Sequence, residues 1–475
     1  MKVTVESLLR ATGGQLVQGD RSTIIESFCN DSRLLRPDSC FVAIRAERDG
    51  HDFIGDASAH GASVALTDRS IDSTVGRDIA IVRVGSTLEA LADIARQVRH
   101  EVLASANVVG ITGSTGKTST KDLCAGALRS VRVHTTSQSF NNEIGLPLTI
   151  LDAPENTEVL VLEMGARFRG NIQELCDIAA PSIGIITNIG LAHAEHLGGI
   201  AGVLATKGEL FASLPENGLA ILPAGEFADA LSERTSAETM RVGLKADASA
   251  RPDVTVHVVD LDEELRPTVR IESPWGAAEM RVGLRGAHQG VNAAMAFVAA
   301  LRCGVEVEAA ADGISRATGS DWRMEVVTVA NDVTLINDSY NANPTSMRAA
   351  IDALTQAPCR GHRIAVVGSM RELGLHSEEE HLKLGARCAE APIDILICVG
   401  EEGAWIARGA ELRIDSMTGR RFATVDTVKD AEAASAVLEK VVGPGDTILV
   451  KASRALGLEA VAKSVQGYPT RGGAS

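Results

Sequence analysis

A glycine-rich run with one lysine and several hydroxyl side chains is the sharpest chemical feature of the sequence. Its residues are Thr112-Gly113-Ser114-Thr115-Gly116-Lys117-Thr118-Ser119-Thr120, between the apolar stretch Val108–Ile111 and a helical pattern. That setting is typical of a phosphate-binding loop, whose backbone N–H groups and helix N-terminus attract phosphate oxygens. Lys117 would reach the β- and γ-phosphates, and the Thr118 hydroxyl would bind Mg²⁺. Ile111 replaces the first glycine of the strict motif, so a glycine-rich surface turn is the alternative.

Polar side chains also follow two further apolar strands. Glu163 comes directly after Val159–Leu162, and His193 lies in the loop after Ile183–Ile186. In open α/β sheets, ligands bind at the carboxyl ends of the strands. Glu163 is therefore placed to hold Mg²⁺ beside the phosphate loop, and His193 is a candidate metal ligand from the neighbouring strand end. An exposed carboxylate without a role and a structural or solvated histidine are the alternatives.

Five other polar positions carry weaker signals. Lys207 lies on a helical run and, by sequence alone, is a surface lysine. Asn292 lies near the start of an alanine-rich helix. Asp338 follows a predicted strand, where it faces either a ligand crevice or an ordinary turn. Lys451 and Arg454 follow another strand, where they form either an anion site or a basic turn.

The elements that must position these groups fall into three units. The chain has 475 residues, which suggests about three domains at roughly 150 residues each. Residues 1–85 mix short strands and helices. Residues 86–318 open with a helical stretch, Leu88–Leu103, and contain the phosphate loop. Residues 319–475 form the third unit.

The hydrophobic pattern predicts an α/β protein with three domains. The second unit alternates near-continuous apolar strands with helical segments, which indicates a parallel sheet covered on both faces. Its segment Val254–Val282 alternates apolar and polar residues, which predicts an antiparallel appendage. The third unit repeats the strand–helix alternation, which indicates a doubly wound, Rossmann-like domain.

Charge and composition exclude several classes of protein. The sequence has 46 Lys+Arg against 62 Asp+Glu, a net charge of −16, which disfavours binding to nucleic acid or to an anionic membrane. No apolar run reaches the ~18 residues that span a bilayer. The start, Met1–Glu6, lacks the apolar core of a signal peptide, so we expect a cytoplasmic protein without membrane insertion. The eight cysteines form no C-x-x-C pair, which favours reduced, buried thiols over disulfides or zinc sites.

Taken together, these motifs resemble the Mur ligase family, the ATP-dependent amide ligases that build the stem peptide of peptidoglycan. The phosphate loop marks the superfamily. Three further runs resemble the branch that adds D-alanyl-D-alanine to UDP-N-acetylmuramoyl-tripeptide: Asn141-Asn142-Glu143-Ile144-Gly145, Asp338-Ser339-Tyr340-Asn341-Ala342-Asn343-Pro344 and Met370-Arg371-Glu372-Leu373-Gly374. The resemblance covers nearly the whole chain and implies a uridine-binding N-terminal unit, a central ATP-binding unit and a C-terminal unit that closes over it.

The resemblance also implies catalytic roles in the central unit. Lys117 and the loop backbone would hold the ATP phosphates, and Thr118, Glu163 and His193 would surround Mg²⁺. Lys207 matches a lysine that is carbamylated in several family members, where the new carboxylate binds a second Mg²⁺. The implied cofactors are therefore ATP, two Mg²⁺ ions and a carbamylated lysine.

Further contacts are implied on both sides of that centre. Asn292 would contact the adenine side, and Arg323 and Asp338 would reach the nucleotide as the domains close. In the first unit, Asp31-Ser32-Arg33 and Asp49-Gly50-His51-Asp52-Phe53 resemble segments that recognise uridine diphosphate. The candidate contacts there are Ser32, Arg33, Asp49 and His51.

The implied substrates are UDP-MurNAc-tripeptide and D-Ala-D-Ala, and we expect a monomer. ATP would convert a carboxylate into an acyl phosphate, which the amine then attacks. One alternative is a related ligase that adds diaminopimelate or lysine, or glutamates to folate. Asn341-Ala342-Asn343-Pro344 in place of a D-N-P-R-like run counts against the amino-acid-adding relative. The other alternative is a nucleotide-binding scaffold that has lost catalysis.

Several positions depart from the family pattern. Ala46 replaces a usual Gly, Ser369 replaces the Asp of a G-D-M run, and Ala452 replaces the Gly of K-G-S-R. Ser320-Asp321-Trp322 precedes Arg323 where a Pro-Gly is common. None of these changes removes an expected metal or phosphate ligand.

Overall fold

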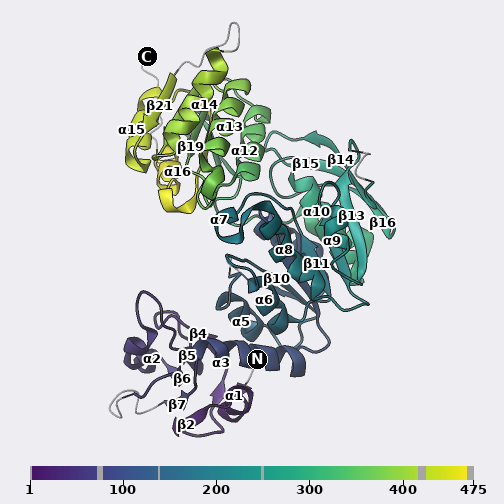
Figure 1. Cartoon of the computed structure of the whole chain (residues 1–475), viewed down its shortest axis with the longest axis vertical. Coiled ribbons are helices and arrows are strands. Elements are labelled where there is room, and N and C mark those ends of the chain that lie inside the picture. Colours follow the sequence, from purple (N-terminus) through teal and green to yellow (C-terminus); the bar gives the residue numbers. More distant parts are fainter. Residues whose placement is uncertain (1–2, 72–78, 137–139, 248–250, 416–423, 468–475) are drawn as a thin grey trace.

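Three main β-sheets occupy consecutive parts of the chain and confirm the predicted α/β class. The structure is a computed structural model that describes residues 3–71, 79–136, 140–247, 251–415 and 424–467. Figure 1 shows the three sheets and their helices arranged in a row along the long axis, with the N-terminal unit at one end and the C-terminal unit at the other. The central unit therefore contacts both neighbours.

The first sheet has five strands in the order β2-β7-β6-β5-β4, with β2 antiparallel to β7 and the rest parallel. A separate pair, β1 (Val3–Thr4) and β3 (Ile24–Ile25), lies beside it. The strands of the sheet are β2 (Gln15–Gln18), β4 (Ser27–Cys29), β5 (Ser39–Val42), β6 (Ala62–Thr67) and β7 (Ala80–Arg83). The helices of this region are α1 (Val5–Thr12), α2 (Ile54–Ala59) and α3 (Thr87–Glu101), and α3 confirms the helix predicted from Leu88.

The central sheet has nine strands in the order β16-β15-β14-β13-β12-β11-β8-β10-β9. Its strands are β8 (Asn107–Thr112), β9 (Val133–Thr135), β10 (Val159–Glu163), β11 (Ile183–Ile186), β12 (Leu219–Pro223), β13 (Glu238–Leu244), β14 (Val254–Leu261), β15 (Pro267–Ser273) and β16 (Gly276–Arg281). Strand β14 pairs parallel with β13, whereas β15 and β16 pair antiparallel. The predicted antiparallel appendage is therefore a continuation of the main sheet.

Helices cover both faces of the central sheet. They are α4 (Lys117–Ala127), α5 (Gly145–Asp152), α6 (Asn171–Ala179), α7 (Ala194–Leu197), α8 (Gly199–Ala212), α9 (Ala228–Ser232), α10 (Gln289–Arg302) and α11 (Val307–Ser315). Along β10, Leu160 and Leu162 enter the core that contains α5 and α6, whereas Val159 and Val161 enter the core that contains α4 and α10. Successive strand residues point to opposite faces, so a strand buried on both faces must be apolar throughout.

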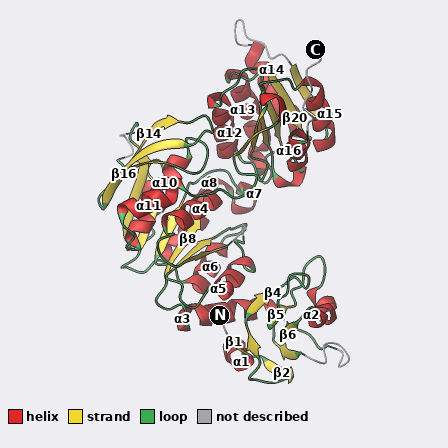
Figure 2. Cartoon of the chain, turned by 180° about the vertical axis from the view of Figure 1, so that it is seen from behind, coloured by secondary structure: helices red, strands yellow, loops and turns green. Residues whose placement is uncertain are grey.

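The third sheet has six strands in the order β17-β18-β22-β19-β20-β21, and all pairs except β17–β18 are parallel. The strands are β17 (Glu325–Thr328), β18 (Thr334–Asn337), β19 (Arg363–Gly368), β20 (Ile395–Val399), β21 (Thr424–Val428) and β22 (Thr447–Lys451). One face packs on α12 (Pro344–Gln356), α13 (Ser377–Glu390) and α14 (Gly403–Asp415), and the other on α15 (Ala431–Val441) and α16 (Glu459–Gln466). Figure 2 shows this doubly wound arrangement from behind.

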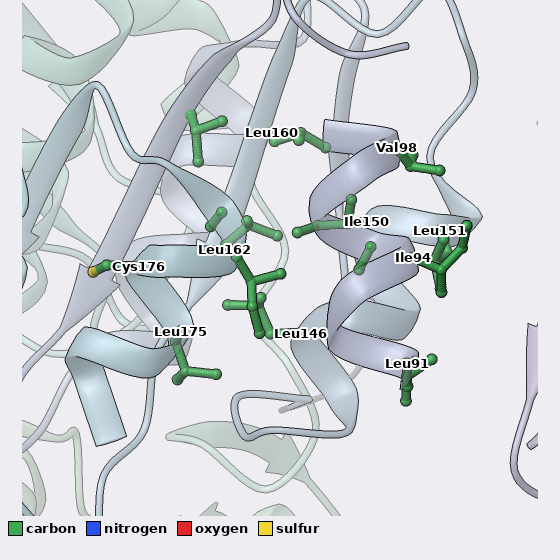
Figure 3. Close-up of a cluster of buried hydrophobic side chains, with 14 of the residues drawn as sticks. Leu91, Ile94, Val98, Leu146, Ile150, Leu151, Leu160, Leu162, Leu175 and Cys176 are labelled. Carbon is green, nitrogen blue, oxygen red and sulfur yellow. The ribbon is translucent and has the colours of Figure 1, made fainter. Parts of the chain in front are cut away.

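Helix α3 joins the first unit to the central unit through one continuous apolar core. The same cluster of buried side chains includes Val42 and Leu66 of the first sheet and Leu160 of the central sheet. Figure 3 shows the central part of this cluster, where α3 packs beside α5. Its labelled residues are Leu91, Ile94, Val98, Leu146, Ile150, Leu151, Leu160, Leu162, Leu175 and Cys176.

The third unit is attached differently. Its two cores are separate clusters, and the central unit contributes Leu265 and the partly buried Leu191 to one of them. Where the chain enters the third unit, Asp122 Oδ2 on α4 accepts hydrogen bonds from Ser320 N at 2.9 Å and from Ser320 Oγ at 2.8 Å. A small apolar contact and a few polar bonds leave relative motion of two units as the default expectation.

Within the described ranges, none of the helices is long and apolar enough to span a bilayer. All eight cysteines lie in these ranges and are free thiols, as the sequence predicts. Burial raises the pKa of the Cys388 thiol to about 12, which keeps it protonated and inert at neutral pH.

We predict that Ile94→Ala on α3 lowers the free energy of unfolding by about 2–5 kcal/mol, because it leaves a cavity in the shared core. Ile94 is 1% exposed, whereas Leu412 on α14 is 58% exposed and serves as the control. Leu412→Ala is expected to change the free energy by less than about 0.5 kcal/mol. Urea unfolding followed by circular dichroism measures both values, and equal values for the two variants would contradict the packing role of α3.

Candidate active site

The phosphate loop leaves β8 in a conformation that requires glycine. Gly113 has φ +147°, and a Cβ atom there would lie 1.9 Å from Thr187 Oγ1. The loop after β11 holds the phosphate loop through Asn188. Asn188 Oδ1 accepts from Thr115 N at 2.7 Å, and Asn188 O accepts from Ser114 N at 3.1 Å. Because β8 and β11 are neighbouring parallel strands, their carboxyl ends meet at one edge and fix the loop.

Helix α4 begins where the loop ends. Gly116, with φ +78°, is the residue before its first turn, so the free N–H groups of that turn face the loop. Lys117 Nζ donates to Gly113 O at 2.7 Å and curls back over the loop. Burial lowers the pKa of Lys117, nearby Arg323 lowers it further, and Glu163 opposes both. A polyphosphate bound at this helix N-terminus would supply negative charge that favours the protonated form of this lysine.

Thr118 and Glu163 form a buried oxygen pair beside the lysine. Thr118 Oγ1 donates to Glu163 Oε2 at 2.7 Å, and Asn141 Nδ2 donates to Glu163 Oε1 at 2.7 Å. Among the described residues, no three His, Cys, Asp or Glu side chains cluster as a metal cage. Mg²⁺ keeps several waters and usually binds through one or two carboxylates plus substrate phosphates, so this hydroxyl–carboxylate pair suits it.

Lys207 is a buried lysine, and the prediction of a surface position from sequence alone is wrong. It lies on α8 with 1% of its surface exposed. Burial lowers its pKa to about 7, Lys117 adds to this effect, and Glu209 and Glu163 oppose it. The amine is therefore neutral in a large fraction of molecules near pH 7, and a neutral amine is nucleophilic.

His193 precedes α7 at the margin of the central unit. Its Nδ1 lies within hydrogen-bonding distance of Glu372 Oε2, on the loop after β19 of the third unit. Burial lowers the pKa of His193, and Lys117 and Lys207 lower it further, whereas Glu372 raises it. The neutral imidazole favoured by burial is the form that binds a metal.

Asp338 and Lys451 form an ion pair at the edge of the third sheet. Lys451 Nζ donates to Asp338 Oδ2 at 2.6 Å and to Asn341 O at 2.8 Å. Met324 N donates to the other carboxylate oxygen of Asp338 at 3.1 Å. The pair follows two adjacent parallel strands, β18 and β22, whose carboxyl ends face the phosphate loop.

Arg323 and Arg454 stack on different aromatic rings. The Arg323 guanidinium carbon lies 4.0 Å from the centre of the Tyr340 ring, whereas that of Arg454 lies 4.4 Å from the centre of the Trp322 ring. Arg454 also pairs with Glu459 at 3.3 Å. The sequence leaves an anion site and a basic turn open for Lys451 and Arg454, and the structure does not place both in the cleft. The short helix after β22 turns Arg454 away, so of these two described residues only Lys451 lines the cleft.

A cleft of about 430 Å³ lies between the central and third units. Its opposite walls are the phosphate loop and the start of α12, where Asn343 Nδ2 donates to Ser114 O at 3.4 Å. Asn292 on α10 lines the cleft beside Gly116. Only 8% of its surface is exposed, and its side-chain amide donates to Gln289 Oε1 at 2.9 Å. The predicted site residues that line the cleft are Ser114, Thr115, Gly116, Lys117, Thr118, Ser119, Glu163, His193, Asn292, Arg323, Asp338 and Lys451.

The four first-unit candidates lie outside this cleft, on the loops of the first sheet. His51 is a scaffold residue: its side chain is 1% exposed, with Nδ1 2.6 Å from Asp49 Oδ1 and Nε2 3.1 Å from Asp68 Oδ1. The hydrogen bonds from His51 hold the pKa of Asp49 below its usual value. Arg33 is 82% exposed and pairs with Asp31 at 2.7 Å, and Ser32 is partly exposed. Arg33 and Ser32 are therefore accessible to a ligand, whereas the His51 ring is enclosed.

Several residues that organise the site have no role predicted from the sequence. Asn141 orients Glu163, Asn188 supports the phosphate loop, Tyr340 carries Arg323, and Glu372 contacts His193. Asn188 lies two residues after the end of β11, which is a usable signal. The contacts of Asn141 and Glu372 span 22 and 179 residues of sequence, and no local pattern indicates them.

The departures from the family pattern are structurally accommodated. Ser369 donates to Glu402 across neighbouring loops of the third sheet. Ala452 is fully buried under Gly368, and Ala46 is exposed on a loop of the first unit. None of the three lines the cleft as far as the described chain shows.

We predict that Lys207→Met stabilises the chain more at pH 7 than at pH 9. The pKa of Lys207 is about 7 when folded and about 10.4 when unfolded, so between pH 7 and 9 the unfolded state is more fully protonated at this amine than the folded state. Wild-type stability therefore rises with pH in this window, and the advantage of the variant should shrink by about 2 kcal/mol. Urea unfolding in bicarbonate-free buffer measures it. Exposed Lys245→Met should show a constant difference, and a constant difference for Lys207→Met would mean that Lys207 stays protonated.

Two family models match the chain. Residues 111–300 match the Mur ligase middle domain, and residues 322–454 match the Mur ligase glutamate ligase domain. The first range contains the phosphate loop, Glu163, His193, Lys207 and Asn292, and the second contains the third-unit wall of the cleft.

Whole-chain relatives agree with these matches. The chain is 38% identical to the UDP-N-acetylmuramoyl-tripeptide–D-alanyl-D-alanine ligase of Mycobacterium tuberculosis strain H37Rv, over 93% of this chain and 92% of that protein. It is 34% identical to the enzyme of the same name from Bacillus subtilis, over 98% of each chain. The fold is similar to MurF from Acinetobacter baumannii, with a TM-score of 0.87 and 29% identity over 98% and 99% of the two chains. It is also similar to MurF ligase from Thermotoga maritima in complex with ADP, with a TM-score of 0.76 and 29% identity over 93% and 97%. By sequence, fold and the arrangement of its cleft, this chain belongs to the Mur ligase family.

Proposed function

We propose that this chain is an ATP-dependent amide ligase that adds D-alanyl-D-alanine to UDP-N-acetylmuramoyl-tripeptide, and so makes a peptidoglycan precursor. The observation that carries the proposal is the cleft itself: a phosphate loop and a buried Thr118–Glu163 pair face the third unit across it. The names of the relatives in M. tuberculosis and B. subtilis support the choice of substrates. The runs that begin at Asn141, Asp338 and Met370 support the same branch.

ATP would bind with its phosphates on the loop and its base toward α10. The ADP complex of the T. maritima relative supports nucleotide binding by this chain. Lys117 and the first-turn N–H groups of α4 would hold the β- and γ-phosphates, with Gly113 and Gly116 allowing close approach. Asn292 would lie on the adenine side, and Arg323 and Asp338 would contact the nucleotide from the third unit.

Thr118, Glu163 and His193 would hold Mg²⁺, which supplies positive charge to the oxygens of the transferring phosphoryl group. The hard oxygen donors of Thr118 and Glu163 support this role. The neutral amine of Lys207 can attack CO₂ and lose a proton, giving a carbamate whose negative charge the neighbouring Lys117 would favour. That carbamate would supply the carboxylate for a second Mg²⁺.

The acceptor substrate would reach the cleft from the first unit. Ser32 and Arg33 are the accessible candidates for the uridine diphosphate, while Asp49 and His51 would act by shaping the loop. We propose that residues 1–85 carry this function, 86–318 the ATP site and 319–475 the closing unit. ATP and a nucleotide sugar are substrates of the cytoplasm, so we propose that compartment, with the monomer as the working form.

The reaction needs two displacements. A carboxylate oxygen of the tripeptide attacks the γ-phosphorus, the bond from that phosphorus to the bridging oxygen breaks, and ADP leaves. The amine nitrogen of the dipeptide then attacks the acyl carbon, loses a proton, and expels inorganic phosphate. Lys117 and the loop amides stabilise the charge that develops on phosphate oxygens. Closure of the third unit keeps water from the acyl phosphate, which would otherwise hydrolyse.

We predict that purified protein releases phosphate from ATP only when both UDP-MurNAc-tripeptide and D-Ala-D-Ala are present. Lys117→Ala should lower the rate by about 10²–10³-fold, because it removes a positive charge from the transition state. Exposed Lys440→Ala is the control and should keep the wild-type rate. A coupled phosphate assay across a panel of amines tests this.

An equal rate with free diaminopimelate, lysine or glutamate would assign the chain to another ligase branch. No release with any amine, together with partner binding that survives Lys117→Ala, would favour the non-catalytic scaffold.

We predict that Lys207 takes up ¹³CO₂ and gives a carbamate resonance in the ¹³C NMR spectrum of the full chain. The signal should grow as the pH rises from 6 to 8, because the neutral amine becomes more populated above its pKa of about 7. Lys207→Met should abolish it, and Lys245→Met should leave it unchanged. A spectrum of wild-type protein that matches Lys207→Met would contradict the carbamate and leave Thr118, Glu163 and His193 as the metal ligands.

A further inference from the structure

One side-chain contact joins the candidate metal site to the third unit. His193 lines the cleft from the central unit, and its Nδ1 lies within hydrogen-bonding distance of Glu372 Oε2 from the third. The two side chains are 28% and 33% exposed, so the contact sits at the half-open margin of the cleft. The contact spans two units that share little apolar core, so it can form and break with their relative motion.

Both residues are held in the left-handed backbone region, which is costly for residues other than glycine. His193 has φ +57° and Glu372 has φ +63°. His193 O accepts from Leu197 N at 3.1 Å, which fixes it at the start of α7. Across the interface, Glu195 N donates to Glu372 O at 3.2 Å. A strained backbone conformation persists only where the surrounding structure holds it, so the positions of His193 and Glu372 are fixed by their surroundings.

The loop that carries Glu372 is anchored inside the third unit. Arg371 N donates to Ser453 Oγ at 2.9 Å, and Met370 N donates to His381 Nε2 at 2.8 Å. The side chains on either side, Met370 and Leu373, are each 1% exposed. The position of the Glu372 carboxylate is therefore set by the third unit as a body.

The chemistry of this contact fixes the state of the histidine. A carboxylate accepts a hydrogen bond, so Nδ1 must carry the proton and Nε2 keeps its lone pair. A carboxylate on the second ring nitrogen orients a metal-binding histidine and makes it more basic as a ligand.

We propose that Glu372 is a positioning residue that makes His193 a competent Mg²⁺ ligand only when the third unit is docked. This inference rests on the proposed metal role of His193. It couples closure of the cleft to assembly of the metal site: an open enzyme would hold Mg²⁺ less tightly and would waste less ATP. By contrast, Thr118 and Glu163 hydrogen-bond to each other, and Asn141 of the central unit also holds the Glu163 carboxylate.

The test compares two substitutions at Glu372 with a matched control in the full chain. Glu372→Leu keeps the approximate size and removes the acceptor, whereas Glu372→Gln keeps an acceptor oxygen and removes the charge. Glu378→Leu is the control, because Glu378 lies in the same unit, is 56% exposed and is 3.9 Å from Arg408 rather than at the cleft. Thermal unfolding of each variant checks that the fold is intact.

The main readout is binding of Mn²⁺, as a probe for Mg²⁺, to protein saturated with ADP, followed by electron paramagnetic resonance. We expect Glu372→Leu to weaken Mn²⁺ binding by about tenfold or more. Glu372→Gln should recover part of that loss, and Glu378→Leu should match wild type. The Mg²⁺ concentration for half-maximal phosphate release should shift in the same order, whereas ADP affinity in excess EDTA should not change.

Unchanged Mn²⁺ affinity in Glu372→Leu would overturn the proposal. So would an equal loss of ADP affinity with and without metal, because that pattern means that the contact only holds the two units together. The Mn²⁺ measurement needs no turnover. It would therefore test the role of Glu372 even if the protein showed no activity in the ligase assay.

Discussion

Desolvation of charged side chains at the carboxyl edge of the central sheet is the constraint on which the rest of the structure depends. Burial lowers the pKa of Lys117 and of Lys207, Glu163 opposes that shift in both, and Glu163 and Lys207 are almost fully buried. Isolated charges in such a place would be expensive, so each must have a partner or lose its charge. Thr118 and Asn141 donate hydrogen bonds to the Glu163 carboxylate, and Lys117 donates to the carbonyl of Gly113. Lys207 instead has its pKa lowered to about 7. The same low-dielectric setting would make these groups effective on a phosphoryl group.

The two neighbours of the central unit are attached in ways that suit different tasks. The first unit shares an apolar core with it through α3, so the first sheet is fixed relative to the phosphate loop. The third unit meets it through a small apolar contact and a few polar bonds, at Asp122–Ser320, Ser114–Asn343 and His193–Glu372. Polar contacts exchange with water at little net cost, so this interface can open and close where the buried one cannot.

The net charge of −16 adds a second constraint. The proposed substrates are anions, so the field of the whole chain opposes their approach. Attraction must come from local devices: the helix N-terminus at Gly116, Lys117, bound Mg²⁺ and Arg323, which stacks on Tyr340 in the cleft. Lys451 contributes less than the sequence suggests, since Asp338 already neutralises it.

The local pattern of the sequence predicts the main strands of the central sheet and the part of the site that lies at their carboxyl ends. The alternation of β10 between two cores, the strand before the phosphate loop and the position of Glu163 all follow from short-range periodicity, because a strand buried on both faces has a distinctive composition. Burial and pairing across units do not follow from it. The sequence pattern predicts a surface position for Lys207 and leaves an anion site or a basic turn open for Lys451 and Arg454. It does not indicate the contact of Glu372 with His193, which is 179 residues away. Those properties depend on which sheets pack together and how the chain turns between them, so only the tertiary structure decided which charges are buried and which side chains meet across the cleft.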